Sequence, residues 1–158
     1  MSDSTSRGGN AWARTLESAT EMADDLRAEG WEVVTIRAGH VAPEPPEAGD
    51  TGRFGYVYLA QGEIAEQFQA AIADGSFDSY EVFASREGND LFLLTRVVDE
   101  DRRLAVLLVG AVDLTQADDL ARAARERGEM YSHVVLLDGT HLGSFRHDAP
   151  SVLLPEDV

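Results

Sequence analysis

The side chains of this sequence that are best suited to chemistry gather near its C-terminal end. Three of the four histidines, His133, His141 and His147, fall within fifteen residues of one another, and Asp138 and Arg146 lie between them. Histidine and aspartate act as general acids and bases when they share a cleft with a reacting group, and arginine can orient them. A small enzyme or ligand-binding protein would therefore use these five residues as its site.

The spacing of the histidines argues against a metal site. Asp138-Gly139 between two apolar runs predicts a hairpin with a type I′ turn. In that register His133 faces Ser144, and His133 and His141 project from opposite faces. A metal needs ligands that converge within about 2 Å of one ion. A one-residue bulge at the turn would bring both histidines to the same face, so the exclusion of a metal site holds only for the unbulged register. We expect no metal and no cofactor.

Composition excludes several classes of catalyst. The chain has 158 residues and no Cys, which removes disulfides, Cys-ligated zinc and thiol nucleophiles. All 13 basic residues are Arg, so a phosphate-binding Walker loop and Schiff-base chemistry are also excluded. The patterns GxGxxG, GxSxG and HExxH do not occur. These exclusions favour a non-enzymatic interaction or regulatory domain, with the histidine-containing hairpin as the alternative site of an enzyme.

The excess of acidic residues predicts a protein that works in concentrated salt. The 29 acidic residues against 13 arginines give a formal net charge of −16. Such a chain repels itself in dilute buffer, but at molar salt the Debye length falls to about 3 Å and the repulsion is screened. We therefore expect a halophilic protein; a GC-rich genome would explain Arg in place of Lys but not the acid excess. No basic cluster suggests a nucleic-acid partner.

No segment of the sequence predicts export or membrane insertion. The N-terminal residues contain no apolar run, and the longest apolar stretch, Leu104 to Val112, has nine residues. We expect a cytoplasmic protein whose partner is another protein or a second copy of the chain.

The periodicity of apolar residues predicts an α+β domain. Apolar residues recur at helical spacing from Trp12 to Leu26, and alternating or continuous apolar runs bounded by turns predict strands. The predicted elements are a helix at 10–29, strands at 31–37 and 54–60, a helix at 62–74, strands at 80–86, 90–98 and 102–112, a helix at 115–127, and strands at 130–137 and 140–146. In order they read α-β-β-α-β-β-β-α-β-β, which predicts one mostly antiparallel sheet with about three helices.

The prediction divides the chain into one domain and two tails. Residues 1–9 are expected to form a disordered tail, residues 10–148 the domain, and residues 149–158 a C-terminal tail. The Pro-rich stretch 38–53 is expected to be a surface loop between two strands.

Two resemblances bear on identity. The segments WEVVTIRAGHVAPEPPEAGDTGRFGYVYL, FDSYEVF and LDGTHLGSFRHD resemble small haloarchaeal domains of unknown function, over residues 12–148; this implies a habitat and no activity. The element order over residues 10–128 is similar to the roadblock/longin-like fold, whose members are small dimeric regulators of GTPases and scaffolds. The final hairpin departs from that pattern.

The acid excess should make the stability of the protein depend on salt. The melting temperature should rise steeply between about 0.1 and 2 M KCl, because salt screens the repulsion among the acidic side chains. Calorimetry or circular dichroism across this range measures the effect. A flat melting temperature would contradict the halophile interpretation.

Overall fold

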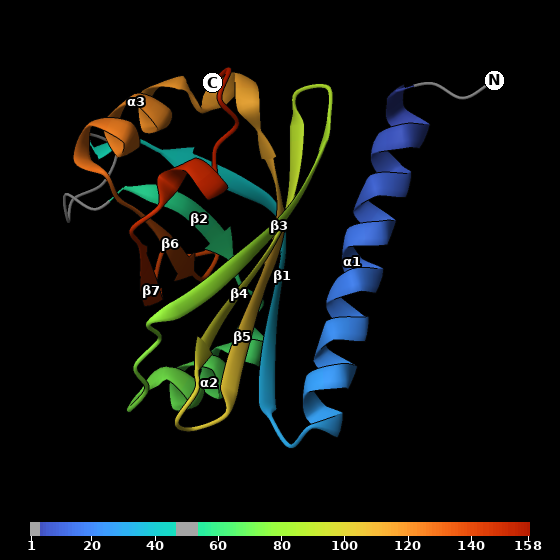
Figure 1. Cartoon of the computed structure of the whole chain (residues 1–158), viewed down its shortest axis with the longest axis vertical. Coiled ribbons are helices and arrows are strands. Elements are labelled where there is room, and N and C mark those ends of the chain that lie inside the picture. Colours follow the sequence, from blue (N-terminus) through green and yellow to red (C-terminus); the bar gives the residue numbers. More distant parts are fainter. Residues whose placement is uncertain (1–3, 47–53) are drawn as a thin grey trace.

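The computed structural model describes residues 4–46 and 54–158, which form three α-helices and one seven-stranded sheet (Figure 1). The α+β prediction with about three helices is confirmed. The helices are α1 (Ser4–Ala28), α2 (Gly62–Ile72) and α3 (Asp118–Arg127). The strands are β1 (Glu32–Glu44), β2 (Gly55–Leu59), β3 (Ser79–Glu87), β4 (Asp90–Asp99), β5 (Leu104–Asp113), β6 (Met130–Val135) and β7 (His141–His147). Single 3-10 turns occur at Leu114–Gln116 and Pro150–Val152.

The sheet is mixed, with the strand order β3-β4-β5-β1-β2-β6-β7. Antiparallel pairs dominate, as expected, but β1 pairs in parallel with β5 and β2 pairs in parallel with β6. The long strand β1 joins the two halves of the sheet. It pairs with β5 from Glu32 to Val41, whereas it pairs with β2 only from Val41 to Glu44. Among the described residues, the first part of β1 therefore has a strand neighbour on one side only.

Strand β1 runs further than the sequence predicted. The stretch 38–53 was expected to be a loop, but its first residues continue the strand to Glu44, and residues 47–53 lie outside the described residues. The register against β5 shifts between Arg37 and Gly39, so Ala38 is an extra residue that bends the strand. Gly39 has a φ of +71°, a conformation that glycine adopts without strain. The bulge lets one strand serve two differently oriented partners.

Helix α1 covers one face of the sheet (Figure 1). Its small residues Ala19 and Ala23 are buried against Ala105, Leu107 and other apolar residues of the sheet. The helix begins at Ser4, so residues 4–9 of the predicted tail are helical, and residues 1–3 lie outside the described residues. None of the described helices is long and apolar enough to cross a membrane.

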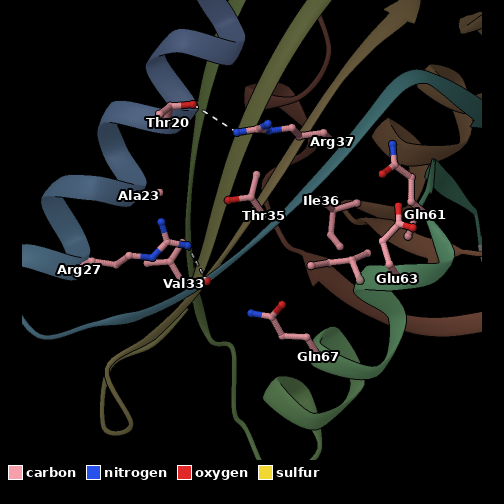
Figure 2. Close-up of a pocket in the computed structure, with 12 residues that line it drawn as sticks. Thr20, Ala23, Arg27, Val33, Thr35, Ile36, Arg37, Gln61, Glu63 and Gln67 are labelled. Atoms are coloured by element: carbon pink, nitrogen blue, oxygen red, sulfur yellow. Dashed lines mark hydrogen bonds between the residues drawn. The ribbon is translucent and has the colours of Figure 1, made fainter.

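Two arginines link α1 to β1 (Figure 2). Arg27 on the helix donates from Nη2 to the carbonyl oxygen of Val33 at 3.2 Å. Arg37 on the strand donates from Nη2 to the hydroxyl oxygen of Thr20 at 3.3 Å. These bonds place both guanidinium groups along the same side of β1.

The other face of the sheet curls around the main core. Its two outermost strands approach each other, because Tyr80 on β3 packs edge-on against His147 on β7 with ring centroids 4.6 Å apart. The Tyr80 hydroxyl also accepts a hydrogen bond from the Ala149 backbone at 2.9 Å. The aromatic stripe Phe54, Tyr56 and Tyr58 is buried within this core, as an apolar stripe under helices should be.

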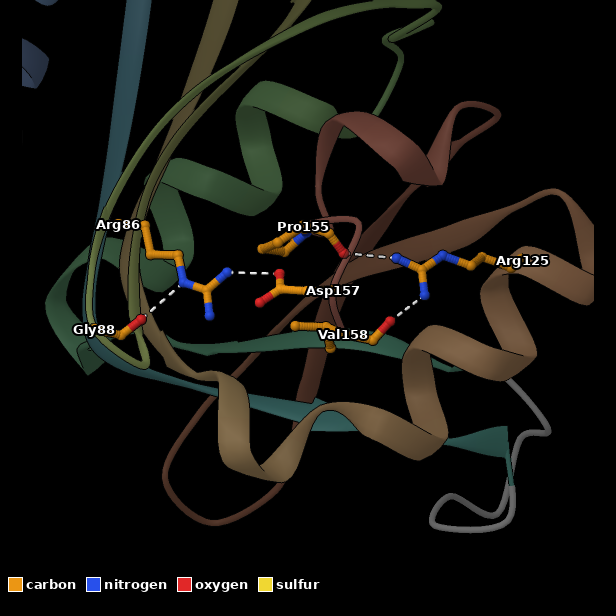
Figure 3. Close-up of polar contacts among 6 residues, drawn as sticks. All are labelled: Arg86, Gly88, Arg125, Pro155, Asp157 and Val158. Atoms are coloured by element: carbon orange, nitrogen blue, oxygen red, sulfur yellow. Dashed lines mark hydrogen bonds and ion pairs between the residues drawn. The ribbon is translucent and has the colours of Figure 1, made fainter.

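The C-terminal segment 149–158 packs onto the domain. Leu153 and Leu154 are buried in the main core, and the Tyr56 hydroxyl donates to the Leu153 carbonyl at 2.6 Å. Two arginines from distant elements bind the last residues (Figure 3). Arg86 pairs with Asp157 at 2.7 Å, and Arg125 donates to the carbonyl oxygens of Pro155 and Val158. The segment expected to be a tail thus closes one side of the core.

Truncation of Leu153 should measure this closure. Leu153→Ala should lower the free energy of unfolding by about 2–5 kcal/mol, because it leaves a cavity in the core while the backbone bond to Tyr56 remains. The neighbouring Val152 is half exposed, so Val152→Ala should cost less than about 0.5 kcal/mol. Urea unfolding of both variants compares them. Equal small effects would mean that the segment does not pack on the domain in solution.

Candidate functional site

The final hairpin does not have the predicted turn. A type I′ turn requires positive φ at both central residues. Here Gly139 has a φ of +91°, whereas Asp138 does not have a positive φ. The Leu136 amide bonds to the Thr140 carbonyl at 2.9 Å, which closes a three-residue loop. The predicted type I′ turn is therefore wrong.

A bulge in β7 decides where the histidines lie. His133 pairs with Ser144, Val134 with Gly143, and Val135 with His141, so Leu142 is the extra residue. The shift brings His133 and His141 to the same face, with ring centroids 6.0 Å apart. The unbulged register predicted His133 and His141 on opposite faces, and that prediction is wrong because of this one extra residue.

Ser144 lies between these two histidines. Its hydroxyl oxygen is 2.7 Å from His133 Nδ1 and 2.7 Å from His141 Nε2, and His133 Nε2 is 3.3 Å from the carbonyl oxygen of Phe54. A hydroxyl beside an oriented imidazole is the arrangement of an activated nucleophile. Within the described part of the chain, no group of three potential metal ligands converges.

The remaining candidates lie apart from this group. Arg146 pairs with Glu129 at 2.6 Å. Asp138 accepts hydrogen bonds from Thr140 at the turn, which hold the pKa of its carboxyl below the usual range. His147 is fully buried on the opposite face, where Nε2 is 2.8 Å from the Ser132 hydroxyl. The five residues of the predicted site therefore do not converge on one cleft.

The described surface also has a groove that the sequence did not predict. Two adjoining cavities of about 390 and 670 Å³ share Arg37, Ala60 and Gln61 as a common wall. Together they run between α1 and the start of α2, and on to the turn between β6 and β7. Of the hairpin's five candidate residues, only Asp138 lines either cavity. We call the 390 Å³ part the polar cavity and the 670 Å³ part the apolar cavity.

The unpaired edge of β1 lies along the polar cavity (Figure 2). The Glu32 amide bonds to the Arg103 carbonyl beside β5, whereas the Val33 carbonyl accepts from Arg27 instead. Backbone groups of successive strand residues point to alternate sides. The amides and carbonyls of Thr35 and Arg37 therefore point away from β5 as well, toward the groove.

Two cations line the polar cavity of this acidic chain. Arg37 is exposed and bonds to the neutral hydroxyl of Thr20, and it forms no ion pair with any described residue. Arg27 contacts a carboxylate only at 4.0 Å, that of Asp24. Glu63 lines the opposite wall on α2. Arg37 is thus a cation without a counter-charge at the junction of the two cavities.

The apolar cavity exposes leucines to solvent. Leu137 is 88% exposed and Leu59 is 39% exposed, and Leu136, Ala38 and Ala60 complete its apolar wall. One signal of this surface was visible in the sequence: Leu137 directly precedes Asp138-Gly139, in a turn where polar residues are the rule. No feature of the sequence marked the unpaired strand edge, because that edge depends on which residues of β1 pair with β2.

A family model matches residues 1–155, nearly the whole chain. The chain belongs to a family of unknown function (DUF7529). No curated protein and no solved structure matches it. In this DUF7529 member, the groove and the histidines of the final hairpin are the two candidate sites.

Buried His147 should make stability pH-dependent. Desolvation, together with the charge of His133, lowers the pKa of His147 from 6.5 to about 4, against the opposing effect of Asp148. The unfolded chain takes up a proton below pH 6.5 and the folded chain does not. His147 thus contributes up to about 3 kcal/mol above pH 6.5, and this is lost as the pH falls toward 4.

Urea unfolding between pH 7 and pH 4 in high KCl tests this dependence. His147→Gln should flatten the slope of unfolding free energy against pH relative to the wild type. His141→Gln, at an exposed position, is the control and should keep the wild-type slope. Identical slopes in all three proteins would show that His147 is not held neutral.

Proposed function

We propose that this DUF7529 member is a non-enzymatic interaction domain that binds an extended segment of a partner protein along the unpaired edge of β1. The observation that carries the proposal is that edge itself, which lies along a groove between α1 and α2. An added strand would bond to the outward-pointing backbone groups of Thr35 and Arg37. Strand addition to an exposed edge is a recurring mode of peptide recognition.

The walls of the groove select a single strand over a second sheet. Proteins usually blunt an exposed edge with Pro, Lys or a covering element. The residues Glu32–Gly39 contain no Pro and no Lys. Instead, α1 and α2 flank the edge, so another folded sheet would collide with the helices while one extended segment about 4.8 Å from β1 would not.

An enzyme built on the final hairpin has less support. The Ser144 group offers a hydroxyl and two imidazoles, but Ser144, His133 and His141 line neither cavity of the groove. Catalysis needs a cleft that holds a substrate beside the reacting groups. These contacts support a role in fixing the bulged hairpin.

The charge distribution supports a cytoplasmic role in a salt-accumulating, haloarchaeal cell. Of the described acidic side chains, only Asp99 is buried; there the Ser76 amide bonds to its carboxylate and lowers its pKa. The other described acids stand at the surface or near it, where they stay hydrated at high salt.

Amide exchange measured by NMR tests the docking edge. In the free domain the Thr35 and Arg37 amides should exchange fast, because they face the groove, whereas those of Val34 and Ile36 should be protected by β5. Peptides selected from a random library in high KCl should protect Thr35 and Arg37 when bound. Selected peptides that leave both amides unprotected would overturn the proposal.

A matched pair of variants locates the contact. Leu137→Ser removes an exposed apolar residue of the groove and should weaken a selected peptide by roughly tenfold or more, given the value of a buried leucine. Val152→Ser removes a half-exposed apolar residue elsewhere and should leave the dissociation constant unchanged. Equal behaviour of the two variants would place the peptide outside the groove.

A further inference from the structure

We infer that the docked segment carries an acidic side chain bound by Arg37 and, beside it, a large apolar side chain that fills the apolar cavity. This inference rests on the proposed function, because it names the chemistry of the partner at the same groove. It uses the turn of the final hairpin but none of its histidines.

The Arg37 guanidinium has donors that no carboxylate of the described chain occupies. A guanidinium has five N–H donors in a planar fork that matches a carboxylate in a bidentate contact. The only side-chain hydrogen bond that Arg37 makes to a described residue is to the Thr20 hydroxyl, at 3.3 Å. Six other arginines pair with carboxylates of the described chain. In a chain of net charge −16, an arginine without such a pair is available to a carboxylate from outside.

The position of Arg37 on β1 fixes the direction in which an acidic side chain of the docked segment must point. Val33 and Thr35 line the same cavity as Arg37, and these three alternate residues of β1 face α1. Residues paired across two strands point to the same face of a sheet. The acid of an added strand must therefore face α1, with its neighbours facing α2. The Thr35 hydroxyl lines the same cavity and can donate to the carboxylate, whereas the Thr20 hydroxyl already donates to the Leu16 carbonyl at 3.1 Å.

The apolar cavity lies directly beside Arg37 and can take an apolar side chain of the docked segment. Arg37 also lines the apolar cavity, together with Leu59 and Leu137. An acid on Arg37 thus places the next part of the segment over these leucines. A cavity of about 670 Å³ has room for an aromatic or leucine side chain, whose burial also covers Leu137.

The lining also disfavours a polyanion. Glu63 faces the polar cavity from α2, and Asp138 lines the apolar cavity. A nucleic-acid backbone would place further phosphates against these carboxylates. One acid followed by an apolar side chain meets Arg37 and the leucines and avoids both.

The experiment compares sequences selected in about 2 M KCl, where long-range attraction is screened and hydrogen-bonded contacts remain. A random seven-residue library displayed on phage should yield Asp or Glu close to Leu, Phe or Trp. For a selected peptide, Arg37→Gln should raise the dissociation constant roughly tenfold or more, the range for a charge-assisted hydrogen bond. Arg103→Gln is the control, since Arg103 bonds to the Glu29 carbonyl away from the groove.

A double-mutant cycle closes the test. Replacing the peptide's acid by its amide should weaken binding to the wild type and to Arg103→Gln, but not further to Arg37→Gln. Peptides that protect the Thr35 and Arg37 amides yet lack an acid, or that bind Arg37→Gln equally well, overturn this inference and leave the proposed function standing. Peptides that protect neither amide overturn the proposed function itself.

Discussion

The architecture depends on one strand that belongs to two half-sheets. Strand β1 pairs with β5 along most of its length and with β2 only near its end. The strand bends at its bulge within the pairing with β5. Where the pairing with β2 begins, β5 comes very close: a Cβ on Gly110 would lie 2.1 Å from a methyl carbon of Val41. Only glycine permits that approach. Because β2 joins β1 so late, the half-sheet β2-β6-β7 turns inward until β7 meets β3 at Tyr80 and His147. Because β2 pairs only with the end of β1, the first part of β1 has no strand neighbour among the described residues on the side away from β5. The curvature of the sheet and the groove therefore have the same cause.

The closure of the sheet also explains why polar groups lie in the core. Where β3 and β7 meet, His147 is buried with Ser132 and Tyr80, and the nearby Tyr58 hydroxyl has its pKa raised by burial. A buried imidazole without a carboxylate partner is held neutral. The C-terminal segment completes this closure, since Ala149 bonds to the Tyr80 hydroxyl and Leu153 caps the core. The Tyr80–His147 contact thus joins the two outermost strands, and His147 lies on the face of the final hairpin opposite to His133 and His141.

Local patterns predicted the helices and strands, and tertiary contacts decided the site. The apolar residues from Trp12 to Leu26 recur at helical spacing, which predicts a helix. The polar turns on both sides of β4 bound apolar runs, which predicts strands. The facing of His133 and His141 changed with one extra residue, Leu142, and no composition signal marks a bulge inside an apolar strand. The sequence did not predict the groove either, because the groove depends on how far β1 continues and on where β2 pairs with it. Pro and Gly in 38–53 indicate a loop, yet the strand continues through its first residues, and its pairing length depends on β2, far from the residues that form the edge.

The acidic surface constrains which docking mode can work. If the protein meets molar salt, attraction between distant charges is screened, while burial of apolar surface becomes more favourable. Backbone hydrogen bonds along a strand are short-ranged and persist. A groove that combines an unpaired edge, exposed leucines and one arginine in contact range uses the interactions that salt leaves intact. A binding surface built from many separated charges would not. The position of Arg37 in the two cavities' common wall, with Leu137 in the apolar cavity beside it, then has a physical reason. The leucine supplies affinity, and the arginine, acting only at contact, supplies the choice of partner.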